Sequence, residues 1–237
     1  MKAVLPACPV RGAVATGGWH AERVSTYRLL LCVLVFVLLG ALTCQAGTDE
    51  RPRFEVDHVF FLTEPSAPEV ASFEQAGFLV RPRTVRHADQ GTAGRYIYFD
   101  NIYIELLWVA DAGVADENIP RANTDFTRRK DWSPTGSVSP VGIGLRDRAY
   151  ATAPPAPEHI YKADWMGPAP EDVLGVLTPG ERLAEPWVFR MPNSWTGEPA
   201  QTASPRLKQF LAHPNGARRV TEVVFHVPAP MISSGLG

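Results

Sequence analysis

Residues 53–62, RFEVDHVFFL, and residues 102–109, IYIELLWV, decide how the folded part of this chain is organised. Both stretches are rich in Phe, Val, Ile and Leu, which favour β-strands. Alternation along the first stretch places five side chains on one face: Phe54, Val56, His58, Phe60 and Leu62. In the second stretch, Glu105 shares its face with Tyr103, Leu107 and Val109. Each strand therefore carries one titratable residue, His58 or Glu105, on an otherwise apolar face.

The residues between these two strands predict a helix and two further strands. Ser66-Ala67-Pro68-Glu69 has the pattern of a helix N-terminal capping box with proline in the first turn, and Gly77 ends the helix. Residues 78–86 and 95–99 are the two strands, separated by a polar loop at residues 87–94. The predicted order is therefore βαβββ.

The pairing of His58 with Glu105 has two interpretations. A buried carboxylate without a partner costs several kcal/mol, so Glu105 should be paired, protonated or bound to a cation. A His and a Glu that meet across a curved sheet are part of a plausible divalent-metal site. The alternative is a histidine satisfied in the core or at a sheet edge, with a glutamate that faces solvent.

Several motifs then indicate a family. Val56-Asp57-His58-Val59, Ile104-Glu105-Leu106, the loop HADQGTAG at residues 87–94 and HPNGARRV at residues 213–220 together resemble the glyoxalase-like group of the vicinal oxygen chelate superfamily. The resemblance extends over residues 53–227 and is thin between residues 147 and 184. Gly94 departs from the pattern, since the group commonly has Asn at that position.

The resemblance implies an α+β fold of paired βαβββ modules, each a half-barrel, whose clefts face one another. In metal-using members, a His on the first strand and a Glu on the last strand of a module bind a divalent cation that polarises oxygens of the substrate. His58 and Glu105 occupy these two positions. The predicted catalytic residues are Glu105 and His87, and the predicted ligand-binding residues are Tyr103, Gln90 and Thr92.

The second module is predicted to be degenerate. Residues 141–146 resemble its first strand and residues 185–191 its last, but the positions that correspond to His58 and Glu105 fall near Ile143 and at Phe189. His226, Glu222 and His87 are the candidates for a third ligand. We favour His226, which lies on a predicted strand at residues 219–227. Proline-rich sequence makes a long helix improbable within this module, leaving at most a helical turn or two at residues 171–176.

Residues in the loops and in the proline-rich half have open interpretations. His87 either acts as an acid–base group at the cleft mouth or is an exposed loop histidine, and the second interpretation is favoured slightly. Gly91 is expected to adopt an unusual backbone torsion. Trp132, Trp165, Trp187 and Trp195 either wall an apolar pocket or pack under long loops, with packing favoured.

The first 46 residues are expected to be separate from the folded domain. Residues 29–42, LLLCVLVFVLLGAL, follow Arg28 and precede small residues, the pattern of a signal peptide. A retained membrane anchor is the alternative, because 18 residues are free of charge up to Ala46. Translation is hypothesised to start at Val24. The predicted location is therefore outside the cytoplasm, periplasmic or membrane-anchored.

The domain organisation follows from these boundaries: export segment 1–46, first module 50–112, linker 113–140, second module 141–227 and tail 228–237. The three cysteines all lie before residue 47, so the folded part has no disulfide or thiolate site. From residue 47 onward the chain has 19 basic and 24 acidic residues, a net charge of −5. This charge makes nucleic acid an unlikely partner.

Three functions remain open from sequence. The first is an enzyme, a lyase, isomerase or dioxygenase that acts on a small oxygen-bearing metabolite with a divalent metal ion. The second is a metal-free protein that sequesters a small molecule in the same cleft. The third is an envelope protein with a structural cleft. A homodimer that completes the cleft is a further expectation.

Overall fold

The computed structural model describes residues 53–133, 136–148, 158–195 and 197–225. The chain divides into two units, residues 1–51 and 52–237, and all described residues belong to the second. The predicted export segment, His226 and the tail lie outside the described residues. Within the described ranges, no helix combines the length and apolar character that a bilayer crossing requires.

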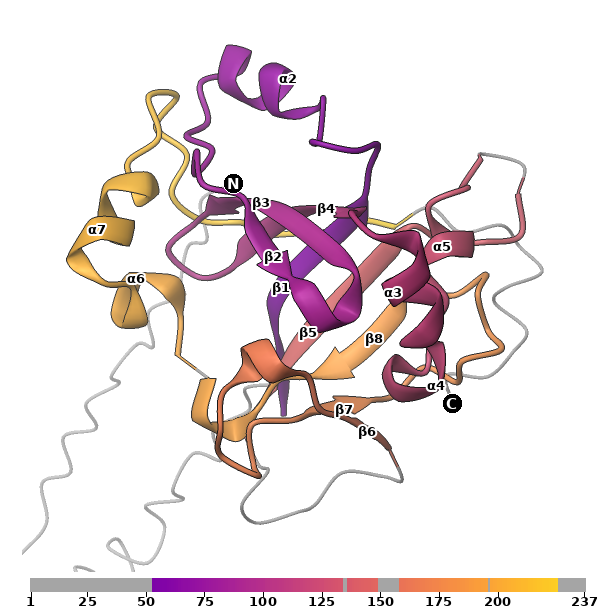
Figure 1. Ribbon diagram of the computed structural model, residues 1–237. Coiled ribbons are helices and arrows are strands. Elements are labelled where there is room, and N and C mark those ends of the chain that lie inside the picture. The colour runs from indigo at the N-terminus through magenta and orange to yellow at the C-terminus, as the bar shows by residue number, and fades with distance from the viewer. Residues whose placement is uncertain (1–52, 134–135, 149–157, 196, 226–237) are drawn as a thin grey trace, which may run out of the picture. The chain divides into compact units, whose positions relative to one another are not determined.

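The first module has the predicted βαβββ order (Figure 1). Its elements are β1 (Phe54–Leu62), α2 (Val70–Gln75), β2 (Val85–His87), β3 (Thr92–Tyr98) and β4 (Tyr103–Val109). Strands β2, β3 and β4 are antiparallel to one another, and β4 pairs in parallel with β1. Because β4 lies directly beside β1, the strands that carry His58 and Glu105 are neighbours.

Helix α2 begins later than predicted. Ser66 and Ala67 have φ of 70° and 52°, which a helix cannot contain, and the N-cap is Glu69 without a side-chain hydrogen bond. The predicted capping box is therefore wrong, because the chain turns at Ser66 instead of starting the helix. The predicted end is confirmed, since Gly77 follows the helix with φ of 79°.

The second strand is shorter than predicted, three residues in place of residues 78–86. The preceding apolar residues pack against the core near α2, where the Phe78 ring contacts Phe73 and Phe99. The Leu79 amide donates to the His213 ring and not to a neighbouring strand. Tertiary packing therefore replaces strand pairing here, and the third strand begins earlier, at Thr92.

The second module continues the same sheet. It contains β5 (Val141–Asp147), β6 (His159–Tyr161), β7 (Leu174–Val176) and β8 (Trp187–Arg190). The eight strands form one curled half-barrel sheet in the order β2-β3-β4-β1-β5-β8-β7-β6. Antiparallel pairing of β1 with β5 joins the modules. Residues 171–176, predicted as a helical turn, instead contain β7, which pairs with both of its neighbours.

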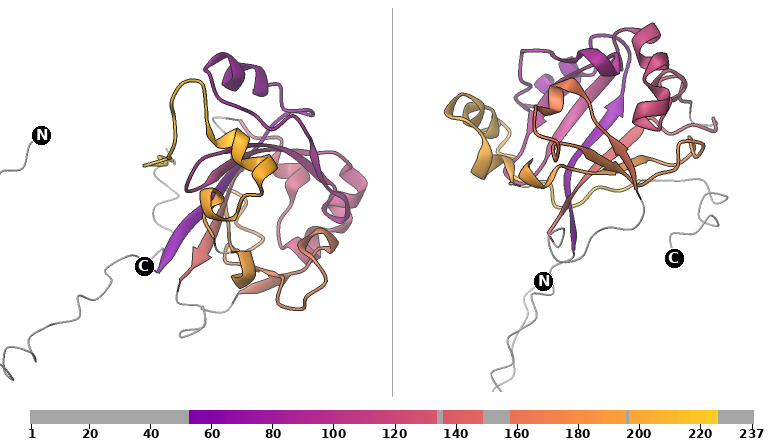
Figure 2. Two further views of the ribbon diagram at one scale, coloured as in Figure 1. Left: turned by 90° about the vertical axis from the view of Figure 1, so that its left-hand side faces the viewer. Right: turned by 60° about the horizontal axis from the view of Figure 1, so that its bottom comes forward.

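Short helices connect and follow the modules. The linker forms α3 (Ala112–Glu117), α4 (Ile119–Ala122) and α5 (Phe126–Arg129), and the chain after β8 forms α6 (Pro199–Thr202) and α7 (Pro205–Lys208). Short 3-10 turns complete the described elements: η1 (Ala88–Gln90), η2 (Asp164–Met166), η3 (Asn193–Trp195) and η4 (Gln209–Leu211). Figure 2 shows α6 and α7 together at one side of the sheet, away from α3 and α4.

The predicted strand at residues 219–227 is wrong for its described part. Residues 217–225 have no regular secondary structure, and Val223 and Val224 are exposed. The side chain of Asn101 accepts from the Val220 amide and donates to the Val220 carbonyl. A side chain therefore takes the place of a partner strand.

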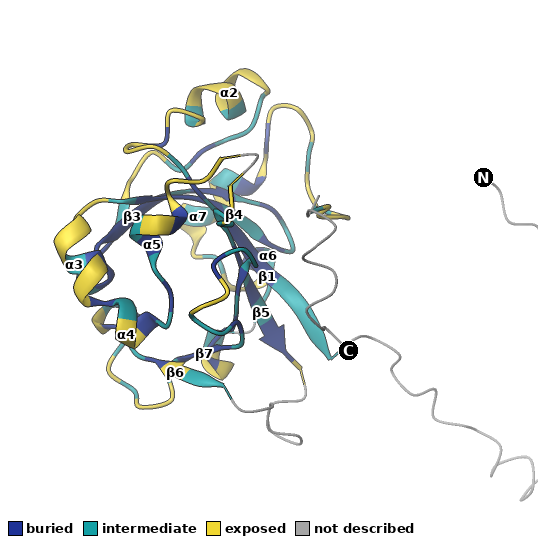
Figure 3. Cartoon of the chain, turned by 90° about the vertical axis from the view of Figure 1, so that its right-hand side faces the viewer, coloured by how far each residue is buried: buried dark blue, intermediate teal, exposed yellow. Residues whose placement is uncertain are grey.

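The core consists of two apolar clusters, one on each face of the sheet. One cluster fills the concave side with side chains of both modules, including Phe60, Phe126 and Trp187. The other includes Trp108 and packs beneath α2, as predicted for that tryptophan. Figure 3 shows buried strands at the centre, with the exposed surfaces of α2 and α3 outside.

Candidate functional site

The concave cluster leaves a cavity of about 60 Å³ between the two modules. Among the lining residues are the titratable candidates of the first module, His58, His87, Tyr103 and Glu105, together with Tyr96, which the sequence did not single out. Gln90 also lines the cavity. A second cavity of about 200 Å³ shares Tyr103, Met191 and Trp195 as walls with the first.

His58 and Glu105 reach the cavity because of strand register. His58 pairs with Tyr103 and Phe60 pairs with Glu105, so His58 and Glu105 are diagonal neighbours on the same face of β1 and β4. Both are 5% exposed. The His58 ring stacks on Tyr103 with centroids 4.4 Å apart. The convergence expected from alternation is therefore present in the structure.

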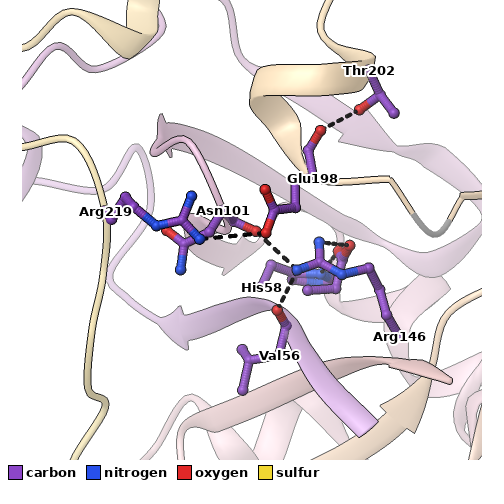
Figure 4. A network of polar contacts seen from close by, with 8 residues as sticks. Val56, His58, Asn101, Arg146, Glu198, Thr202 and Arg219 are labelled. Carbon is purple, nitrogen blue, oxygen red and sulfur yellow. Dashed lines mark hydrogen bonds and ion pairs between the residues drawn. The ribbon is translucent and has the colours of Figure 1, made fainter. Parts of the chain in front are cut away.

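Asp57 belongs to the same polar cluster, and sequence reasoning missed it. The register between β1 and β5 shifts between Val56 and His58, which is a β-bulge at Asp57. A bulge re-aims a side chain that simple alternation would place on the opposite face. Asp57 Oδ1 lies 2.8 Å from His58 Nδ1, and Asp57 Oδ2 accepts from Arg146 Nη1 at 3.1 Å. Figure 4 shows Arg146 of β5 beside His58.

Arg146 holds this cluster in place. Its Nη2 donates to the carbonyls of Val56 and Asn101, both at 2.9 Å. Arg146 is buried, so the Asp57 carboxylate balances its charge away from water. In neutral His58, Nδ1 donates to Asp57, which leaves Nε2 as a hydrogen-bond acceptor.

His87 is buried at the end of β2, so the favoured interpretation of an exposed loop histidine is wrong. Trp165, from the distant second module, covers the ring at a centroid distance of 4.8 Å. Thr92 Oγ1 donates to Gln90 Oε1 at 2.8 Å, so Thr92 accepts from His87 Nδ1 at 3.1 Å. His87 Nε2 then accepts from the Tyr96 hydroxyl at 3.2 Å. Thr92 and Gln90 thus hold His87 in place.

Burial sets the protonation of these groups. Burial lowers the pKa of His87 below its ordinary value, while the Glu105 carboxylate, 3.9 Å from Nε2, acts in the opposite direction. Burial raises the pKa values of Tyr96 and Tyr103 well above the ordinary tyrosine value, and nearby carboxylates add to this. At neutral pH the cavity therefore contains a neutral His87 and two neutral tyrosines.

A pH dependence of stability follows from His87. The unfolded chain takes up this proton near pH ~6.5, and the folded chain takes it up only at lower pH. The stabilising contribution is therefore complete above pH ~6.5 and is lost as the pH falls through the lowered pKa. In urea unfolding at pH 7.5 to 5.5, the wild-type chain should lose more stability than His87→Gln. Equal losses would show that the pKa of His87 is the same in the folded and the unfolded chain, which would contradict the lowered pKa.

Gly91 occupies a position that requires glycine. Its φ is 72°, as expected from sequence, and a Cβ at this position would overlap the backbone of Asp111 and Ala115. Gly91 thereby lets the loop of His87 and Thr92 lie directly against α3.

Gly91→Ala is expected to cost about 2–4 kcal/mol in free energy of unfolding, from left-handed strain and overlap together. Gly216→Ala is the matched control, because Gly216 has φ of 79° but nothing within 4 Å of the added Cβ. That variant should cost about 1 kcal/mol. Equal costs in chemical denaturation would contradict the close packing of Gly91 against α3.

Glu105 has an unsatisfied oxygen. Its Oε1 is buried and forms no hydrogen bond with any described residue. A Cβ at Gly94 would overlap this oxygen, so the departure from Asn at position 94 gives the carboxylate its room. A buried, unpaired acceptor costs about 1–3 kcal/mol. Glu105 is therefore the group in this cavity most in need of a ligand.

The second module supplies an apolar wall in place of a second ligand pair. The β5 positions opposite His58 and Phe60 are Gly144 and Gly142, and a Cβ at either would overlap those rings. Ile143 pairs with Val59 and Gly144 lies opposite His58, so this part of β5 offers no ligand side chain beside His58. Phe189 faces the cavity as predicted, with its ring centroid 5.4 Å from that of His58.

The favoured interpretation of Trp165, Trp187 and Trp195 as loop packing is wrong, since all three line the cavity.

These donors do not fit a resident divalent metal ion. Across the described ranges, no three His, Cys, Asp or Glu side chains come together as a metal-binding group. His58 and Glu105 supply two donors, and Tyr96 occupies His87 Nε2. Glu222 is exposed, and His226 lies outside the described residues. Two protein ligands are fewer than stable sites use.

Comparison with known proteins gives the family. Residues 56–135 match the model of the glyoxalase-like domain, which includes His58, His87 and Glu105. The predicted resemblance is thus confirmed for this segment, which is a glyoxalase-like domain of the vicinal oxygen chelate superfamily. No curated protein matched the chain.

One solved structure that is similar is described as a hypothetical protein from Staphylococcus aureus. It shares 12% sequence identity over 66% of this chain, with a TM-score of 0.37. The alignment spans 64% of the length of that protein.

Proposed function

We propose that this chain binds a small oxygen-bearing molecule in the cavity between its modules and transfers a proton to or from it. The observation that carries this proposal is the Asp57–His58 pair beside the unsatisfied carboxylate of Glu105. Asp57 fixes the tautomer of His58 so that Nε2 is available as a base, and it stabilises the imidazolium formed after proton uptake. Chemistry of this kind is that of an isomerase or a lyase.

Binding without chemistry is the second candidate. Aromatic rings together with Leu174 and Met191 form the second-module wall, an arrangement that encloses a ligand but adds no ionisable group to act on it. A sequestering protein would use this cavity in the same way.

A ligand screen followed by proton exchange distinguishes the two candidates. Small oxygenated compounds would be screened by thermal shift with the full-length chain, and hits incubated in D₂O and followed by NMR. Deuterium incorporation next to an oxygen-bearing carbon, abolished in His58→Ala, is expected for proton transfer. Binding without incorporation would support sequestration. A screen without hits would contradict both candidates.

Metal content is a separate prediction. With two protein donors, the purified full-length chain should contain well below one equivalent of divalent metal by elemental analysis. His58→Ala and Glu105→Gln should leave that content unchanged. One equivalent of metal that is lost in both variants would show that these residues chelate a cation, as in metal-using relatives.

We further propose that residues 24–46 direct export and that the folded unit acts outside the cytoplasm. The support is the uncharged run after Arg28, followed by small residues. Mass spectrometry of the native N-terminus should find no peptide before Val24. Intact residues 24–46 in soluble cytoplasmic protein would contradict export.

A further inference from the structure

The residues that line the cavity contain unsatisfied hydrogen-bonding atoms of both kinds. Glu105 Oε1 is an acceptor without a donor, and Trp165 Nε1 and Trp187 Nε1 are donors without an acceptor. All three atoms are buried, and together they are half of the six such side-chain atoms found in the described ranges. A buried hydrogen-bonding atom without a partner is unfavourable, so each of these atoms favours a ligand that satisfies it.

The two kinds of atom come from different modules. Glu105 lies on β4 of the first module, whereas Trp165 lies in η2 and Trp187 begins β8 of the second. His87 connects them, because it lies 3.9 Å from Glu105 Oε1 and packs against the Trp165 ring. The first-module wall of the cavity thus includes a residue with an unpartnered acceptor, and the second-module wall includes two residues with unpartnered indole donors.

The protein does not satisfy these atoms internally. The Tyr96 hydroxyl lies within hydrogen-bonding reach of both His87 Nε2 and the Glu105 carboxylate, yet Glu105 Oε1 has no hydrogen-bond partner among the described residues. His58 Nδ1 is engaged with Asp57, so Nε2 is the ring nitrogen left for a ligand. The first-module wall therefore accepts hydrogen bonds, and the indole wall donates them.

We infer that the cavity selects a neutral ligand with a hydroxyl group that donates to Glu105 and a second oxygen that accepts from Trp165. This inference rests on the proposed function, because it names the ligand class of the same cavity. It gives the second module a binding role through indole donors. Trp165 becomes a specificity-determining residue, and a ligand that only accepts hydrogen bonds leaves Glu105 unsatisfied.

Ligand size follows from the cavity volume. A water-sized group needs at least about 10–15 Å³ of cavity volume. The cavity of about 60 Å³ therefore admits a ligand of about five non-hydrogen atoms. Hydroxyacetone and methyl acetate are isomers of this size with two oxygens each. Hydroxyacetone has a hydroxyl donor, and methyl acetate has none.

Binding of the two isomers to the full-length chain, measured by saturation-transfer NMR titration, tests the inference. We expect hydroxyacetone to bind about tenfold more tightly than methyl acetate, about 1.4 kcal/mol, because only hydroxyacetone can donate a hydrogen bond to Glu105 Oε1. Trp165→Phe, which removes the indole N–H and keeps an aromatic ring, should weaken the binding of hydroxyacetone about fivefold. The Glu105→Gln variant carries an amide that can donate a hydrogen bond to methyl acetate. It should therefore reduce the ratio of the hydroxyacetone affinity to the methyl acetate affinity.

Two controls and four contrary outcomes complete the experiment. Trp132→Phe and Glu222→Gln change exposed residues outside the cavity and should leave both affinities unchanged. Equal binding of the isomers, or no effect of Trp165→Phe, would overturn the inference while the proposed function stands. If neither isomer binds but other screen hits do, the ligand class is wrong. If no compound binds, the proposed function itself fails.

Discussion

Replacing Arg146 with methionine is expected to lower the free energy of unfolding by about 3–5 kcal/mol, measured by urea denaturation. Arg146 is 3% exposed, and its guanidinium bridges Asp57 to the carbonyls of Val56 and Asn101. Its removal leaves the Asp57 carboxylate buried without a cation. The loss comes from that uncompensated charge more than from the attraction of the pair.

A double variant separates these two terms. Asp57→Leu with Arg146→Met removes both charges and should recover most of the stability that Arg146→Met loses. Arg148→Met is the control, because Arg148 is exposed and its ion pair with Glu55 should contribute less than about 1 kcal/mol. A double variant less stable than either single variant would show that the pair is net stabilising.

The second large effect is expected for Arg129→Leu, which should lower the free energy of unfolding by about 3–5 kcal/mol in urea denaturation. Arg129 is fully buried in α5 and donates through Nη1 to the carbonyls of Ser139, Leu183 and Glu185. Its Nε donates to Thr124 Oγ1 at 2.7 Å. Burial lowers the pKa of Arg129 to about 10, which shows how far the cation is removed from water. One side chain thereby ties the linker to the segment before β8.

Arg128→Leu is the matched control, since Arg128 neighbours Arg129 on the same helix and is exposed. It should change the free energy of unfolding by no more than about 0.5 kcal/mol. If both variants cost the same, the carbonyl contacts of Arg129 contribute nothing, and the linker is held by its apolar side chains alone.

Strand alternation was sufficient to predict the His58–Glu105 neighbourhood. Both residues interrupt apolar faces, and a period of two residues places them on one side of their strands. The same rule failed one residue earlier, at Asp57, because a bulge arises from the pairing of β1 with β5 and leaves no mark in a single strand.

The burial of His87 could not be predicted from the sequence around it, because the contacts that bury it come from distant residues. Its loop is polar, and the ring that covers it, Trp165, lies far along the chain. The strand prediction for residues 219–225 was wrong for a different reason. Their composition favours a strand, but Val220 hydrogen-bonds with the Asn101 side chain and residues 217–225 pair with no strand of the sheet. Propensity alone does not bring a segment to a sheet edge.

The degeneracy of the second module was predictable because Phe189 is visibly not a ligand. The indole donors that the second module offers in place of metal ligands could not be predicted. An indole N–H is recognised as unsatisfied only when its surroundings are known. Trp165 and Trp187 are therefore candidates that sequence reasoning weighed mainly as packing residues.

The shortness of β2 and β6 affects how this protein behaves in a crowded solution. These strands end the half-barrel sheet, and each contains three residues. An exposed sheet edge is a template for the addition of a foreign strand, and a short edge offers few unpaired amides for that purpose. The open sheet is thus protected from edge-to-edge aggregation, and a second copy would gain little by extending it.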